Sequence, residues 1–343
     1  MRHCFQLALL GAGSVAPNPM VGAVLVHNDK IIGEGYHQQY GHAHAEVNCI
    51  EAVPAGMKHL IKESTLYVSL EPCTHFGKTP PCTDLIIKYQ IPDVVIGCLD
   101  SFEKVNGRGV DKLRQAGVRV TTSILEKEAI VLNRRFFTFH KKQRPYIILK
   151  WAESADHKIA NADLSRVMIS NEMTNRLVHK WRREEAAIMV GTNTALHDNP
   201  SLTTRLWPGK DPVRIVIDKE LKLPTGHHLL DRTVQTIIIN TIRQEENGNN
   251  NYYKITGSEN IVAVTLSLLW QRQLISLIVE GGTKLLQSFI EEGCWDEARV
   301  ISNMNMQIET GLHAPVLKHS ILIRQEGING DVINYYSNEK SIL

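Results

Sequence analysis

The sequence has little net charge and no long apolar run, and both absences exclude classes of protein. Lys and Arg number 38 against 36 Asp and Glu, so the net charge is +2 and no strong basic field is available to attract a polynucleotide. No apolar stretch is long enough to cross a bilayer. We therefore expect a small-molecule partner, without nucleic acid and without a membrane.

Cysteine is scarce as well, and the N-terminus offers only an imitation of an export signal. Six cysteines in 343 residues do not form a disulfide framework. The apolar segment at residues 7–10 is very short for a signal peptide, and Pro17 follows the supposed cleavage site. We expect a reducing, cytoplasmic location, in which Cys49 and Cys98 are buried thiols within apolar runs.

The length and composition are those of a globular protein with two domains. A chain of 343 residues can form two cores of ordinary size, and 43% hydrophobic with 22% charged residues is a typical soluble composition. The charged segment 140–145 ends in Pro145 and has the character of a linker. We expect domains at 1–143 and 144–343, no internal repeat, and an exposed Asn-rich loop at 247–251.

The spacing of apolar residues predicts alternating strands and helices, and hence layered α/β units, in both halves. In the first half we expect helices at 3–11, 43–53, 82–89, 110–115 and 126–139, with strands at 20–27, 30–35, 65–70, 93–99 and 118–122. In the second half we expect strands at 146–152, 186–190, 213–218, 233–240 and 274–280, with helices at 170–183 and 284–292.

Two segments bear on nucleotide binding. Residues 11–16, GAGSVA, imitate the dinucleotide fingerprint, which requires a strand before it and a helix after it. A helix is expected before this segment and PNP at 17–19 follows it, so we assign no nucleotide site there. In the second half, Gly281 and Gly282 lie between an expected strand and an expected helix, an arrangement that forms a backbone cradle for an anion.

The first half carries one His, one Glu and two Cys in the order typical of zinc-dependent deaminases. His44 and Glu46 are followed by Cys73, which a proline precedes, and by Cys82. One imidazole and two thiolates provide three ligands of a tetrahedral Zn²⁺ and leave one position for a water whose pKa the metal lowers. Glu46 would stay off the metal and relay a proton from that water to the departing amine.

A closed structural zinc site is the alternative. It needs a fourth protein ligand, and His42 or His75 would serve. In that case the protein is a zinc-stapled binding module whose folding is lost on chelation, whereas the enzyme predicts a folded but inactive apoprotein.

The segment between the two cysteines resembles one enzyme family. Residues 71–82 read EPCTHFGKTPPC, so eight residues separate the cysteines where the general deaminase pattern has two. This segment, HAE at 44–46 and PNPMVG at 17–22 resemble the bifunctional deaminase/reductases of riboflavin biosynthesis. The resemblance implies a three-layer, cytidine-deaminase-like first domain, in which Asn18, His75 and Lys78 contact the substrate.

The second half resembles the reductase domain of the same family. Residues 152–160, AESADHKIA, match its opening motif except that His157 replaces a glycine, and such a turn would be strained if it needs positive φ. Residues 191–205, GTNTALHDNPSLTTR, match a second motif densely. The resemblance implies a dihydrofolate-reductase-like α/β fold without the full dinucleotide fingerprint.

The resemblance also implies which residues bind the ligands of the second domain. The residues that would line NADPH are Ala152, Thr194, Asp198, Gly281 and Gly282, and those that would contact the substrate are Ser165, Arg182, Leu202, Arg205 and Glu280. The planar guanidinium of an arginine suits a phosphate, although a solvated surface charge is the alternative for Arg182 and Arg205. Asp198 is the one weak candidate for a general acid.

The resemblance, which covers roughly residues 3–310, implies two reactions. These are the zinc-dependent hydrolytic deamination of 2,5-diamino-6-(5-phosphoribosylamino)pyrimidin-4(3H)-one and the NADPH-dependent reduction of its ribosyl group to ribityl. A nucleic-acid base deaminase with an accessory domain is a second hypothesis, which the near-neutral charge and 6% aromatic residues weaken. A chain whose reductase domain is inactive because of His157 is a third. We also expect a homo-oligomer.

Overall fold

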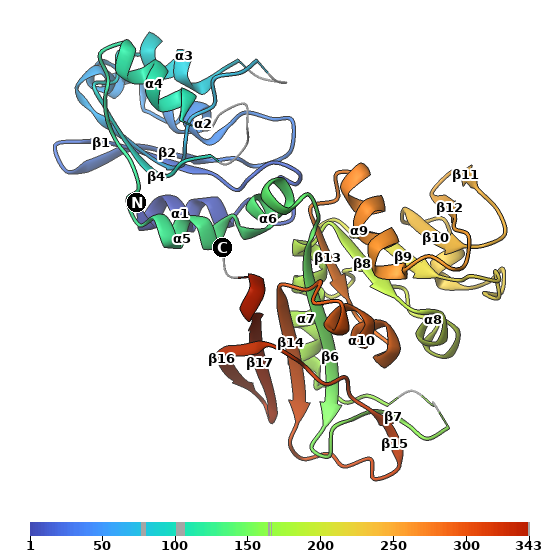
Figure 1. Ribbon diagram of the computed structural model, residues 1–343. Coiled ribbons are helices and arrows are strands. Elements are labelled where there is room, and N and C mark those ends of the chain that lie inside the picture. Colours follow the sequence, from blue (N-terminus) through green and yellow to red (C-terminus); the bar gives the residue numbers. More distant parts are fainter. Residues whose placement is uncertain (77–79, 101–106, 164, 166, 342–343) are drawn as a thin grey trace. The chain divides into compact units, whose positions relative to one another are not determined.

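The protein divides into two compact units. The computed structural model describes residues 1–76, 80–100, 107–163, 165 and 167–341. Contacts between Cα atoms separate Met1–Gln143 from Arg144–Leu343 (Figure 1). Within the described ranges, none of the helices combines the length and the apolar character that a bilayer crossing requires.

The first unit is built on a five-stranded sheet with the order β2-β1-β3-β4-β5. The strands are β1 (Gly22–His27), β2 (Lys30–Tyr36), β3 (Thr65–Leu70), β4 (Asp93–Cys98) and β5 (Arg119–Thr121). β1 runs antiparallel to both of its neighbours, whereas β3, β4 and β5 are parallel. The carboxyl ends of β3 and β4 therefore meet at one edge of the sheet, where ligand sites of α/β units commonly form.

Helices cover both faces of this sheet, so the expected three-layer arrangement is confirmed (Figure 1). One face carries α2 (Ala45–Glu51), α3 (Cys82–Lys88) and α4 (Arg108–Gln115), and the other carries α1 (Arg2–Leu9), α5 (Glu126–Leu132) and α6 (Arg134–Lys142). Ile50, Ile86 and Leu113 belong to the core of the first face, and Phe5 and Phe136 to that of the second. A short 3-10 helix, η1 (Ala55–Glu63), precedes β3.

The prediction of a single helix at 126–139 is wrong in one respect, because the helix is interrupted at Asn133. This residue has φ −104° and ψ 24°, which separates α5 from α6. Its side chain makes hydrogen bonds to the backbone of Met20, a competition with helical structure for which Asn is well suited. The helix α6 then continues to Lys142, so half of the segment expected to be a linker is helical.

The second unit is built on a ten-stranded sheet with the order β11-β12-β10-β9-β8-β13-β6-β14-β17-β16. Its strands are β6 (Tyr146–Ser154), β8 (Ala187–Val190), β9 (Val213–Ile217), β10 (Thr236–Asn240), β11 (Glu245–Asn247), β12 (Asn250–Lys254), β13 (Ser276–Val279), β14 (Glu297–Asn303), β16 (Ser320–Ile328) and β17 (Asp331–Asn338). Pairing is parallel from β12 through β14. A separate ladder joins β7 (Lys158–Asn161) to β15 (Gly311–His313).

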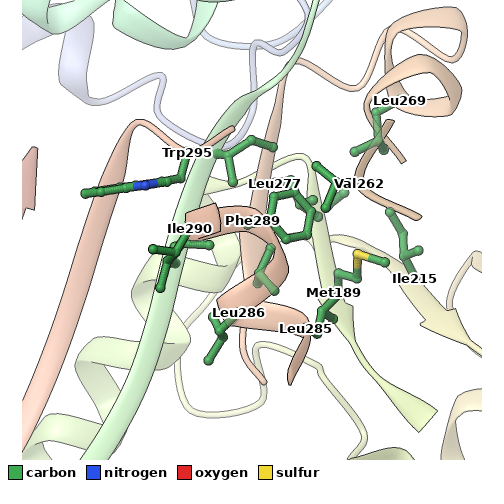
Figure 2. Close-up of a cluster of buried hydrophobic side chains, with 14 of the residues drawn as sticks. Met189, Ile215, Val262, Leu269, Leu277, Leu285, Leu286, Phe289, Ile290 and Trp295 are labelled. Atoms are coloured by element: carbon green, nitrogen blue, oxygen red, sulfur yellow. The ribbon is translucent and has the colours of Figure 1, made fainter. Parts of the chain in front are cut away.

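Helices pack on this sheet and close two hydrophobic cores. They are α7 (Glu172–Glu184), α8 (Thr192–Asp198), α9 (Ile261–Gln271) and α10 (Thr283–Glu291), with 3-10 turns η2 (His228–Leu230) and η3 (Glu339–Ser341). Figure 2 shows Leu286 and Phe289 of α10 gathered with Leu277 of β13 and Val262 of α9. Helix α9 was not predicted, because its run of mostly apolar residues gives no clear helical period.

One expectation about the second unit needs correction, and one segment had no prediction. Asn250 and Asn251 are buried, 3% and 8% exposed, because β12 pairs in parallel with β10. The Asn-rich run is therefore part strand rather than an exposed loop, and only its turn between β11 and β12 lies outside the ladder. The chain after residue 318, for which no structure was predicted, forms the hairpin β16–β17, which extends the sheet antiparallel to β14.

Candidate active sites

Three side chains from separate segments meet at the carboxyl end of β3. His44 is the N-cap residue of α2, Cys82 is the first residue of α3, and Cys73 lies in the loop that follows β3. The Nδ1 of His44 lies 3.3 Å from the Sγ of Cys82 and 3.6 Å from the Sγ of Cys73. Usual Zn–N and Zn–S bond lengths with tetrahedral angles separate such atoms by about 3.5 Å. The donor set therefore fits zinc.

The two thiols differ in acidity. A hydrogen bond from Cys82 is the largest of the effects that lower the pKa of Cys73 to about 4, and His44 and the backbone N–H of Cys82 add to it. The same bond and burial raise the pKa of Cys82. Because the thiolate is the form that ligates metals, Cys73 is already poised as a ligand.

Glu46 lies beside this group in the first turn of α2. Its side chain is almost fully buried, and burial raises the pKa of its carboxyl group. A carboxyl group with a raised pKa can both accept and deliver a proton near neutral pH. In the described part of the chain, the group that could hold a metal comprises His44, Cys73 and Cys82. His42 and His75 are exposed and do not belong to it, so the described residues offer no closed site.

Asn18 is held by a histidine that the sequence did not indicate. The Nδ2 of Asn18 lies 3.2 Å from the Nε2 of His37, and the Nδ1 of His37 lies 3.0 Å from the carbonyl of Ala43. A carbonyl only accepts, so Nδ1 carries the proton, Nε2 accepts, and Asn18 presents its NH₂ group to the ring. The Oδ1 of Asn18 is then directed elsewhere. His75 is exposed, and Lys78 lies outside the described residues.

Glu71 is a second residue that sequence reasoning missed. It is buried, and its two carboxylate oxygens accept four backbone N–H groups, from Asp100, Gly107, Gly109 and Val110. These bonds fix the start of α4 to the end of β3, two residues before Cys73. The sequence placed Glu71 in a motif, but a long-range partner of this kind leaves no signal in local spacing.

The second unit brings several predicted cofactor residues together at the carboxyl ends of β8 and β13. Gly191 donates its N–H to the carbonyl of Gly281 at 2.9 Å. A Cβ added at Gly282 would lie 3.0 Å from the Oγ1 of Thr194, and Gly281 has φ 128°. Helix α10 begins directly afterwards, and the first N–H groups of a helix have no acceptor within it. This close backbone cradle fits the phosphates of a dinucleotide.

The other two predicted cofactor residues lie on elements that adjoin this cradle. Asp198 ends α8, one helical turn after Thr194. Ala152 is in β6, which pairs with β13 through Leu149 and Val279. The residues present in this unit therefore fit NADPH, the cofactor that the sequence indicated.

Charged side chains form a buried cluster beside the cradle. Arg182 donates to Glu280 through Nε at 2.8 Å and Nη2 at 2.7 Å, and the Nζ of Lys150 lies 3.7 Å from the same carboxylate. Burial alone would raise the pKa of Glu280, but Arg182 and Lys150 outweigh it and hold the pKa at about 2. Burial lowers the pKa of Lys150. Lys150 was not predicted, because a single Lys within a strand carries no pattern.

The predicted substrate residues of this unit are only partly brought together. Arg182 is not a solvated surface charge, since its side chain is 13% exposed and it also donates to the carbonyl of Thr203. The side chain of Leu202 packs in the hydrophobic core at φ 53°, so a ligand would meet its backbone. Arg205 and Ser165 are exposed. Ser165 lies in the loop after β7, and its Oγ accepts a hydrogen bond from the Nδ2 of Asn161 at 2.8 Å.

The turn that carries His157 keeps the conformation that a glycine would take. His157 has φ 57°, the left-handed region that the family's glycine reaches without strain. Its Nδ1 lies 2.8 Å from the Oε1 of Glu153, whose other oxygen accepts from the Nε1 of Trp151. These bonds favour the turn at a φ where a side chain is strained.

Comparisons with known proteins agree with this geometry. Residues 1–98 match the model of the cytidine and deoxycytidylate deaminase zinc-binding region, and residues 145–303 match that of the RibD C-terminal domain. Riboflavin biosynthesis protein RibD of Aquifex aeolicus is 42% identical over 303 residues, which cover 86% of this chain and 83% of that protein.

Solved structures resemble the whole chain. A diaminohydroxyphosphoribosylaminopyrimidine deaminase/5-amino-6-(5-phosphoribosylamino)uracil reductase from Thermotoga maritima has a TM-score of 0.90 and 33% identity, over 98% of this chain and 97% of that one. RibD of Acinetobacter baumannii has a TM-score of 0.89 and 28% identity, over the same shares. The chain belongs to the RibD family of riboflavin biosynthesis, and it is an enzyme with a zinc-dependent deaminase domain and an NADPH-dependent reductase domain.

Proposed function

We propose that this enzyme acts on the two substrates that give the Thermotoga relative its name. The first domain hydrolyses the amino group from the diaminopyrimidine ribosylamine phosphate, and the second reduces the ribosyl group of the product to ribityl. The grouping of His44, Cys73 and Cys82 within 4.8 Å, with Glu46 buried beside it, supports the first step most directly.

In the deaminase domain the side chains bind, orient and move protons. Zinc, when bound by His44, Cys73 and Cys82, lowers the pKa of water and so supplies a nucleophile near neutral pH. Glu46 takes a proton as water adds to the amino-bearing ring carbon, and it returns a proton to the nitrogen that leaves as ammonia. The His37 ring binds the Nδ2 of Asn18 and not its Oδ1. This Oδ1 accepts a hydrogen bond from the pyrimidine.

In the reductase domain the cradle binds the cofactor, and the charged cluster supplies a proton. NADPH, when bound, supplies the hydride. The N–H groups around Gly281 and Gly282 would hold its phosphates, and Thr194 and Asp198 would line the cofactor. Lys150 delivers the proton that the opening ribosyl ring requires, because its burial lowers its pKa. It suits this role better than Asp198, the candidate that the sequence offered.

The proposal includes a homo-oligomer formed along β16. In the described part of the chain β16 is one of the two edge strands of the ten-stranded sheet, and its Ile321, Leu322 and Ile323 are 40%, 51% and 65% exposed. Such an edge invites pairing with another chain. An antiparallel copy with Arg324 opposite Glu326 pairs opposite charges. Light scattering should give a multiple of the chain mass for the native protein and a lower mass for Ile323→Lys. A native monomer would contradict it.

The proposal also places the enzyme in the cytoplasm and gives it no nucleic-acid partner. All six cysteines are free thiols, which suits a reducing compartment. The net charge of +2 offers little attraction for phosphate backbones.

One experiment tests the two activities and their order. The protein is incubated with the pyrimidine substrate, with and without NADPH, while ammonia and NADPH are followed. We expect ammonia without NADPH, and NADPH oxidation only after deamination. Ammonia without any later NADPH oxidation would mean an inactive reductase domain, and NADPH oxidation without ammonia would reverse the proposed order.

A further inference from the structure

Asn133 makes an unusual pair of contacts at the junction of α5 and α6. It is 2% exposed. Its Oδ1 accepts the backbone N–H of Met20 at 2.8 Å, and its Nδ2 donates to the carbonyl of Met20 at 2.9 Å. A residue of a neighbouring antiparallel strand would exchange the same two hydrogen bonds. One side-chain amide thus replaces a strand partner for Met20.

Met20 needs this partner because it lies beyond the end of the sheet, two residues before β1 begins at Gly22. The pairing of β1 with β3 extends only as far as Ala23 opposite Val68. The N–H of Gly22 already turns to the Oγ of Ser69, at 3.1 Å, in place of a backbone carbonyl. Further toward the N-terminus, Asn133 therefore anchors the chain where the ladder with β3 has stopped.

The anchored segment carries Asn18, two residues before Met20. The side chain of Asn18 is bonded to His37, and the backbone N–H of His37 donates to Val21 at 2.9 Å. His37 thus holds the segment from the β2 side, while Asn133 holds it from the helical side. The backbone N–H of Asn18 also donates to the carbonyl of Val15 at 2.9 Å. Together these contacts restrict the translation of the segment, and with it the position of the Asn18 amide.

We propose that Asn133 is a positioning residue of the deaminase, which acts on the substrate through Met20 and Asn18. The inference rests on the proposed function, in which Asn18 accepts a hydrogen bond from the pyrimidine ring. Without the clamp, the segment can shift, and misplacement of a binding group by about 1 Å can cost as much as about 100-fold in activity. Asn133 itself does not touch the substrate.

The test compares Asn133→Ala with the native protein, using the full chain loaded with zinc. We expect the KM for deamination to rise about tenfold, with zinc content unchanged. The KM values of the reductase reaction should also be unchanged, because that site lies in the other domain. Asn133→Asp keeps the acceptor for the Met20 N–H and removes the donor, so it should raise the deamination KM as well, and it serves if Asn133→Ala does not fold.

A double-mutant cycle separates positioning from a general loss of structure. If Asn133 acts through Asn18, then adding Asn133→Ala to Asn18→Ala should change the deamination KM by less than twofold, as expected for coupled sites. Asn338 is a matched control, because it is also buried and its Nδ2 donates to the carbonyl of Trp295 at 2.9 Å, within the second unit. Asn338→Ala should leave the deamination KM unchanged.

The outcomes distinguish this inference from the proposed function. If Asn18→Ala raises the KM but folded, zinc-loaded Asn133 variants do not, the positioning role is wrong and the proposed function stands. Additive effects of the two substitutions also overturn it. If Asn18→Ala leaves the KM unchanged, the substrate role of Asn18 is wrong, and the inference falls with it.

Discussion

Replacing Glu280 by Gln would remove the carboxylate that Arg182 and Lys150 share. The side chains of these three residues are 6%, 13% and 14% exposed, so water compensates little for a lost charge. Gln keeps the size of Glu but leaves two buried cations facing a neutral amide. Breaking one side of a buried ion pair in this way is strongly destabilising, because the remaining charge stays desolvated.

The size of the effect can be worked out in two ways. The pKa of Glu280 falls from 4.5 to about 2 on folding. At about 1.4 kcal/mol per unit, this is worth on the order of 3 kcal/mol at pH 7. Removal of one partner from other buried pairs costs about 3–5 kcal/mol. Because the folded pKa is the lower one, this stabilisation is complete above pH 4.5 and is lost as the pH falls through about 2.

Tryptophan fluorescence can report the unfolding of this domain alone. All five tryptophans lie in the second half, namely Trp151, Trp181, Trp207, Trp270 and Trp295. In denaturant titrations, Glu280→Gln should lower the free energy of unfolding by about 3 kcal/mol at pH 7. The difference from the native protein should shrink as the pH falls below 4.5, where the native carboxylate begins to lose its advantage.

Glu220 provides the matched control. It pairs with Lys222 at 2.7 Å, but the two side chains are 68% and 58% exposed, so Glu220→Gln should cost less than about 1 kcal/mol. The reasoning would be refuted if Glu280→Gln were no more destabilising than this control. It would also fail if the loss persisted undiminished at low pH.

Three further predictions test the two sites and the core. Removal of zinc with a chelator, or the substitution Cys73→Ser, should abolish ammonia release while NADPH oxidation on the deaminated substrate continues; loss of both activities would contradict the separation of the sites. Gly282→Ala places a methyl group 3.0 Å from Thr194 Oγ1 and should raise the KM for NADPH about tenfold in steady-state assays, whereas Gly226→Ala, with no atom within 4 Å, should not. Phe289→Ala should lower the stability seen by tryptophan fluorescence by about 3–5 kcal/mol, since Phe289 is fully buried; a loss below 1 kcal/mol would mean that the core relaxes around it.

The parts of the fold that could be predicted are those that local sequence encodes. Strand β3, Thr65–Leu70, has the bounds that its alternating apolar residues predict, and α3 begins at Cys82 after two prolines. The zinc ligands could be predicted for a related reason. His44 and Cys73 stand in short segments whose chemistry and order are tied to one kind of metal site, and the fold only has to bring those segments together.

The parts that could not be predicted depend on contacts between distant segments. The pairing of Arg182 with Glu280 joins residues 98 positions apart, and each was expected to meet the substrate on its own. Asn133 breaks a helix because its amide bonds Met20, 113 positions away. The strand β16 is exposed along most of its length and carries three consecutive apolar residues, so its sequence lacks the alternation that usually marks a strand.

The most direct test of the account is to measure zinc content and ammonia release together for Glu46→Gln. The account assigns Glu46 to proton transfer and not to the metal. It predicts a protein that still binds one zinc per chain but releases ammonia about 100- to 10,000-fold more slowly, with NADPH oxidation on the deaminated substrate unchanged. Ammonia release at the native rate, or loss of the zinc, would contradict it.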